Sequence, residues 1–133
     1  MDDTVLCGLS ASAAVALMAS GELSAETYAT ALLARCGQGA HLNAFINLNA
    51  EQVLAKARAA DAHRIAGKPL ALLHGLPIPV KDSVNTADYP TTGGTNALRG
   101  FRPATDAAEL AGRRAMAAGV RASLMLYAAQ QRR

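Results

Sequence analysis

Lys81 is the residue whose type and position could most readily do chemistry. It ends the segment 76–81 (LPIPVK), in which Leu76, Ile78 and Val80 alternate with two prolines and the lysine. A period of two is typical of a β-strand, so we predict a short strand with three apolar side chains on one face. Because prolines donate no backbone hydrogen bond, this strand must be short, at an edge, or paired through its other residues. A stiff strand would hold the terminal amine in a fixed position.

The aspartate that follows leaves a second interpretation open. Lys81 and Asp82 are adjacent, and such a pair after a strand is commonly an exposed ion pair worth less than about 1 kcal/mol. On these two residues alone, the surface pair is the commoner interpretation.

Other motifs exclude several kinds of site. The segment 91–95 (TTGGT) has neither Walker spacing nor a Gly-x-Gly-x-x-Gly pattern, so we expect a tight polar loop and no phosphate site. The chain has no Gly-x-Ser-x-Gly elbow of the Ser-His-Asp hydrolases. The thiols and imidazoles form no Cys-x-x-Cys pair and no helical histidine pair; they are Cys7, Cys36, His41, His63 and His74. We therefore expect no metal, no cofactor and no disulfide.

Helices must position the strand. Ser10, Ser24 and Asn49 are candidate N-caps of three helices, since their side chains can accept hydrogen bonds from first-turn amides. Gly21 and Gly67 are candidate stops for the first and third of these helices. A fourth helix is predicted over 106–118, after the region of prolines and glycines at 70–104. These residues predict helices that precede one short strand.

Length and composition set the class of protein. The chain has 133 residues, of which 51% are hydrophobic and 17% charged, so we expect one compact domain and no disordered tail. Roughly a quarter of the residues are alanine, which favours helices.

The charge pattern bears on partners and location. The net charge of +3 comes from arginines near one end, without interleaved aromatic residues. We expect a solvated end and no nucleic-acid partner; these arginines are Arg113, Arg114, Arg121, Arg132 and Arg133. The acidic first residues do not form a secretory signal, and no apolar run approaches the ~20 residues that span a bilayer, so we expect a cytoplasmic protein without membrane contact.

The segment around Lys81 closely resembles the first catalytic motif of the amidase signature family. The resemblance covers nearly everything from about residue 8 to residue 120, and the Gly-x-Pro-x-x-x-Lys-Asp string with its Pro-Thr-Thr continuation is its most specific part. The segments that carry it are 20–24, 42–45, 59–61, 73–86, 90–95, 98–103, 106–108 and 117–119.

The resemblance implies a fold, a reaction and a role for Lys81. Members of this family hydrolyse carboxamides with a serine–cis-serine–lysine triad on an α/β fold with a mixed central sheet. Lys81 matches the triad lysine, which as a neutral amine accepts a proton through the bridging serine. An ammonium is no base, so the amine must be buried among apolar groups and away from carboxylates. Asp82 must then lie on the opposite face of the strand, where we expect it to accept hydrogen bonds from the following loop.

The chain also departs from the family pattern. Only Ser83 and Ser123 follow Lys81, and neither lies in the glycine-rich context of the family's bridging serine. Residues 121–133 resemble nothing in the family, so we interpret 1–120 as the N-terminal part of an amidase domain and 121–133 as a divergent basic tail produced by a truncation or frameshift. We expect an incomplete, inactive amidase whose strand lacks a partner strand and leaves its edges open to association.

Two questions stay open. The motifs favour an aryl-acetamide substrate, such as indoleacetamide or mandelamide, over the role of a tRNA-dependent amidotransferase subunit, which would need partner subunits. The alternative to an enzyme is a non-catalytic remnant or association module. The oligomeric state is not predicted.

Overall fold

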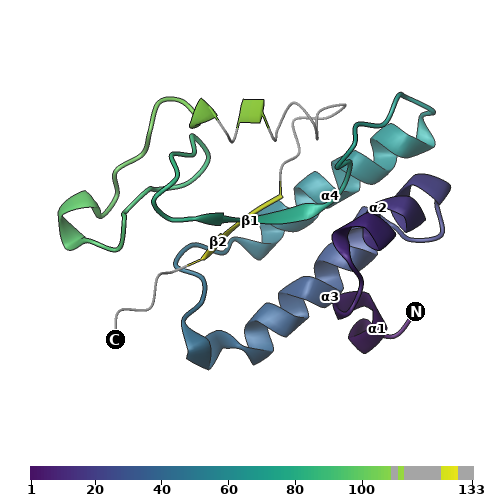
Figure 1. Cartoon of the computed structure of the whole chain (residues 1–133), viewed down its shortest axis with the longest axis horizontal. Coiled ribbons are helices and arrows are strands. Elements are labelled where there is room, and N and C mark those ends of the chain that lie inside the picture. The colour runs from purple at the N-terminus through teal and green to yellow at the C-terminus, as the bar shows by residue number, and fades with distance from the viewer. Residues whose placement is uncertain (109–110, 113–123, 129–133) are drawn as a thin grey trace.

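A computed structural model describes residues 1–108 and 111–112, and the backbone of 124–128. Its helices are α1 (Asp3–Cys7), α2 (Ala11–Ser20), α3 (Ala25–Gln38) and α4 (Ala50–Ile65), with short 3₁₀ helices η1 (Ala40–Leu42) and η2 (Asn96–Leu98). The strands are β1 (Pro77–Lys81) and β2 (Leu124–Ala128). In Figure 1, α1, α2 and α3 lie below the strands β1 and β2, α4 crosses behind them, and the long loop after β1 lies at the upper left. This arrangement confirms the predicted α/β class.

Local signals begin the three long helices where the sequence predicts. Ser10 Oγ accepts a hydrogen bond from the Ala13 amide at 3.2 Å. Ser24 Oγ accepts from Thr27 at 3.0 Å, and Asn49 Oδ1 accepts from the Gln52 amide at 3.0 Å. Each side chain satisfies an amide that the first turn leaves without a helical partner. The predicted caps are confirmed.

Helices α2 and α4 end at or close to the predicted glycines. Gly21 has φ 84° directly after α2, and Gly67 has φ 67° two residues after α4. Both values lie in the left-handed region that glycine adopts without strain. The sequence did not predict α1, whose five residues are capped by Asp2.

The core lies where the four helices α1–α4 meet the residue that leads into β1. Its larger members are Leu6, Met18, Tyr28, Val53 and Leu76, and alanines fill the space between them. The small alanine side chains let the helices approach closely, at the cost of little buried area per residue.

Asp61 joins α4 to the beginning of α3. Its carboxylate accepts hydrogen bonds from the amides of Ala25, at 2.8 Å, and Glu26, at 3.0 Å. A negative charge at this end of a helix also interacts favourably with the helix dipole. The two longest helices are therefore fixed to each other by a polar contact as well as by packing.

β1 has a parallel partner strand. Pro77 pairs with Leu124 and Lys81 with Ala128 in a two-stranded sheet. The expectation that β1 lacks a partner is therefore wrong. Residues 124–128 (LMLYA) are an apolar run of strand length, a pattern that also fits a buried helix, and the sequence analysis left them without an element.

The predicted fourth helix is described only in part. Residues 108, 111 and 112 are helical, and the remainder of 106–118 lies partly outside the described residues. No helix in the described part of the chain combines the length and the apolar character needed to cross a membrane.

Candidate active site at the end of β1

β1 presents the predicted alternation of side chains except at Pro77. Leu76 and Val80 are buried and Ile78 is half-buried, whereas Pro79 and Lys81 are exposed; Pro77, expected on the same face as Pro79 and Lys81, is buried. The apolar face packs on the helical core through Leu76 and Ile78. Burial of this face fixes the register of the strand, because a shift by one residue would expose it.

Lys81 is thus held on the exposed face at the end of β1. Directly after it the chain reverses in a turn, in which the Val84 amide donates to the Lys81 carbonyl at 2.9 Å. The backbone that carries the amine is fixed on one side by the sheet and on the other by this turn. The burial that a neutral amine requires is not provided by the part of the chain that the structure describes.

Asp82 directly follows β1, in the turn, and is 3% exposed. Its Oδ1 accepts a hydrogen bond from the Thr92 amide at 2.9 Å. Its Oδ2 accepts from the Gly94 amide at 3.2 Å and from the Thr92 hydroxyl. Asp82 is therefore the acceptor that organises the following loop, as the sequence analysis expected.

The loop 91–95 adopts a conformation that requires its glycines. Gly93 has φ 56° and Gly94 has φ 72°. Two successive residues in the left-handed region let the chain curl around the Asp82 carboxylate, which side chains with a Cβ would do only under strain. The tight polar loop predicted for this segment is confirmed.

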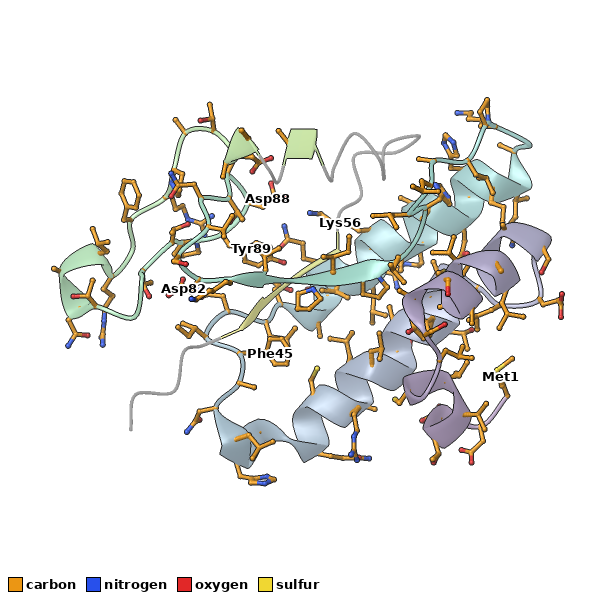
Figure 2. All side chains as sticks on the ribbon, in the orientation of Figure 1. Met1, Phe45, Lys56, Asp82, Asp88 and Tyr89 are labelled. Atoms are coloured by element: carbon orange, nitrogen blue, oxygen red, sulfur yellow. The ribbon has the colours of Figure 1, made fainter. Side chains whose placement is uncertain are left out.

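A second contact fixes the loop after β1 to α4. Lys56 Nζ lies 2.8 Å from Asp88 Oδ2, and both side chains are partly buried. Arg102 donates to the main-chain carbonyl of Asp88 at 3.1 Å. Figure 2 shows Lys56 on α4 and Asp88 on the loop side by side, with Tyr89 close to them. The sequence did not indicate this contact, because Lys56 and Asp88 are 32 positions apart.

A small apolar cluster lies below the loop. Val80 and Tyr89 are buried against each other, with Val84 and Ala107 packed on them. Asp106 Oδ1 accepts from the Ala87 amide at 2.8 Å. The segment from β1 to residue 107 is thus one connected unit around the end of the strand.

No group of three or more metal-ligating side chains lies together within the residues that the structure describes. Ser83, the serine nearest in sequence to Lys81, is exposed in the turn after the strand. The end of β1 therefore offers the amine of Lys81 on a backbone fixed by the strand and the turn, while the carboxylate of Asp82 is engaged in hydrogen bonds with the loop.

Comparisons with known proteins place this unit in a family. A family model described as Amidase matches residues 28–118. A glutamyl-tRNA(Gln) amidotransferase subunit from Chloroflexus aggregans is 43% identical over 117 residues, which cover 87% of this chain and 24% of that protein. The chain thus spans about a quarter of the length of this curated relative.

Two solved structures share the fold. The peptide amidase of Stenotrophomonas maltophilia is 30% identical, with a TM-score of 0.76 over 92% of this chain and 24% of that one. A fatty acid amide hydrolase, at 23% identity, has a TM-score of 0.78 over 95% of this chain and 21% of its own, and shows likeness of fold alone.

Proposed function

We propose, because the chain belongs to the amidase family, that Lys81 is the proton-accepting lysine of a site that cleaves amide C–N bonds. One observation carries the proposal. Lys81 is exposed at the end of β1, whereas the adjacent Asp82 is buried and its carboxylate accepts hydrogen bonds from the amides of Thr92 and Gly94. A carboxylate paired with the amine would stabilise the ammonium, and this carboxylate is instead engaged by the loop.

The proposed role is general base catalysis. The neutral amine of Lys81 accepts a proton through a bridging serine from a second serine, whose oxygen attacks the amide carbonyl. The chain supplies the lysine but no serine in a glycine-rich context. We therefore infer that these 133 residues on their own hydrolyse no amide.

An assay of ammonia release tests whether the 133 residues hydrolyse an amide on their own. The purified chain is incubated with glutamine, with an aryl-acetamide and with a peptide amide, and compared with the Lys81→Ala variant. We expect no release above the uncatalysed rate from either. Release that Lys81→Ala abolishes would show that the chain is a complete catalyst.

A chimaera tests the role of Lys81 itself. Residues 28–118 replace the equivalent segment of the Stenotrophomonas maltophilia peptide amidase, to which the chain is 30% identical. We expect Lys81→Met to lower kcat/KM of the chimaera by at least about a thousandfold, because the members of a catalytic triad act as a unit and removal of one disables the others. Lys68→Met is the matched control, since Lys68 is exposed in the turn after α4. An equally active Lys81→Met chimaera would refute the assignment.

The substrate class is a second step of the proposal. The sequence motifs favour an aryl-acetamide, but the comparisons give that expectation no support. The 43% identical relative is named as a subunit of a glutamyl-tRNA(Gln) amidotransferase. We infer that the amide chemistry of this chain resembles that of the amidotransferase subunit more closely, and that a partner subunit is required.

The alternative function is that of a non-catalytic association module. The absence of a serine in a glycine-rich context after Lys81 favours it for the 133 residues themselves. A fluorophosphonate that labels activated serines separates the two, since the module would show no labelling. We also infer that residues 121–133 are a divergent tail; sequencing the gene beyond codon 120 in all three frames tests this. We further infer a cytoplasmic location, because Cys7 and Cys36 are both free thiols.

A further inference from the structure

The fold brings two histidines together that the sequence left apart. His63 lies in the last turn of α4, and His74 lies just before β1. Their ring centroids are 5.1 Å apart, with an angle of 35° between the ring planes. Eleven residues of chain separate them, so no helical spacing could have indicated the pair.

Both rings are held in the same tautomer. His74 Nε2 lies 2.9 Å from the Ala60 carbonyl oxygen, and His63 Nε2 lies 3.0 Å from the Pro69 carbonyl oxygen. A carbonyl oxygen only accepts hydrogen bonds, so each Nε2 must carry the proton. Each Nδ1 therefore carries an unprotonated lone pair when the ring is neutral.

The lone pair of His74 has no partner. The side chain is 6% exposed, and its Nδ1 is buried without a hydrogen bond in the part of the chain that the structure describes. Buried polar atoms are nearly always satisfied by protein, water or an ion, so this nitrogen points to a missing ligand.

We propose that His63 and His74 bind one zinc-like divalent transition-metal ion through their Nδ1 atoms. With Zn–N bonds of about 2.0–2.1 Å in tetrahedral geometry, two imidazole centroids lie about 5 Å apart, which agrees with the 5.1 Å between these rings. Donation of the other ring nitrogen to a carbonyl is the usual support of a metal-binding histidine.

Solvent would supply the further ligands. His63 is partly exposed, so water can complete the coordination from the solvent side. Arg64, the adjacent cation, directs its guanidinium towards Gly21: a Cβ on that glycine would lie 2.8 Å from Arg64 Nη1. The bound ion would join the C-terminal end of α4 to the turn that enters β1.

Titration of the full chain with Zn²⁺ tests the site. We expect one equivalent to bind by calorimetry, and the Nδ1 resonances of His63 and His74 to shift together in long-range ¹H–¹⁵N spectra. Ala substitution of His63 removes one ligand at a partly exposed position. His74→Gln retains an amide donor for the Ala60 carbonyl and removes the ring nitrogen. Each variant should bind at least about tenfold more weakly, since even loss of a supporting hydrogen bond costs that much.

His41→Ala is the matched control, because His41 is the third histidine of the chain and lies in η1. It should bind Zn²⁺ as tightly as the original chain does. Because an ion that binds only the folded chain stabilises it, Zn²⁺ should also raise the midpoint of thermal unfolding of both chains by the same amount. Binding that survives His63→Ala and is lost when Cys7 and Cys36 are alkylated overturns the proposal, as does absence of binding. If His74→Gln does not fold, as judged by circular dichroism, the comparison of His63→Ala with His41→Ala decides.

Discussion

Removal of the Asp82 carboxylate should open the loop that follows β1. Asp82→Ala removes three hydrogen bonds to a buried charge, from the Thr92 amide, the Thr92 hydroxyl and the Gly94 amide. Bonds to charged groups contribute about 1.5–3 kcal/mol each, but they are not additive. Thr92 is half-buried and Gly94 exposed, so water can replace part of what is lost. We expect a net loss of about 2–3 kcal/mol, and since each 1.4 kcal/mol is a factor of ten, loop opening becomes about 30- to 150-fold more frequent.

Amide hydrogen exchange measures this directly. The amides of Thr92 and Gly94 should exchange faster by that factor in Asp82→Ala. The Gly93 amide should change less, because it donates to the main-chain carbonyl of residue 82 at 3.3 Å, which the substitution retains. Asp3→Ala, at an exposed position of α1, is the control and should leave the loop unchanged. Unaltered exchange at Thr92 and Gly94 in Asp82→Ala would refute the view that this carboxylate organises the loop.

Two further predictions concern global stability and are checked by urea unfolding. Gly75→Ala should lower the free energy of unfolding by about 3 kcal/mol, through strain of the left-handed backbone and through overpacking. The φ angle of Gly75 is 76°, and the new Cβ would lie 3.0 Å from an alanine methyl of α3. Gly67→Ala should cost less, because Gly67 has φ 67° but no atom within 4 Å of the new Cβ. Equal costs for the two glycines would contradict this. Burial, with Cys7 adding to it, raises the pKa of Tyr28 above 10.0 and that of Cys36 above 9.0. The folded chain then holds these protons more tightly than the unfolded chain, so their stabilisation is complete below about pH 9 and is lost as pH rises through the raised pKa values; a constant urea midpoint from pH 8 to 11 would contradict it.

The parts of the fold that the sequence predicted depend on local interactions. The caps at Ser10, Ser24 and Asn49 join a side chain to an amide three residues away. The alternation of β1 likewise arises within one short segment. Such features are visible in one dimension because every participating atom belongs to neighbouring residues. The role of Asp82 was predicted for the same kind of reason, since the pleat alone separates it from Lys81.

The contacts that the sequence did not predict join distant segments. Lys56 and Asp88 are separated by 32 residues, and nothing in the pattern of α4 distinguishes this lysine from a solvated one. His63 and His74 meet only because the chain turns back along α4 after residue 67. The pairing of β2 with β1 depends on a crossover whose middle lies outside the described residues, and apolar runs of that length fit either a strand or a buried helix.

The geometry of β1 explains how one strand can serve both chemistry and structure. A lysine that is to act as a base must be kept away from carboxylates, yet the loop beyond the strand needs a charged acceptor to hold its amides. Adjacent residues of a strand point to opposite faces, so placing the two groups next to each other in sequence separates them in space. Asp82 then fixes the chain directly after Lys81 through Thr92 and Gly94. Its carboxylate is buried and engaged by the loop whereas Lys81 is exposed, so the two adjacent residues do not form the surface ion pair that their sequence suggested.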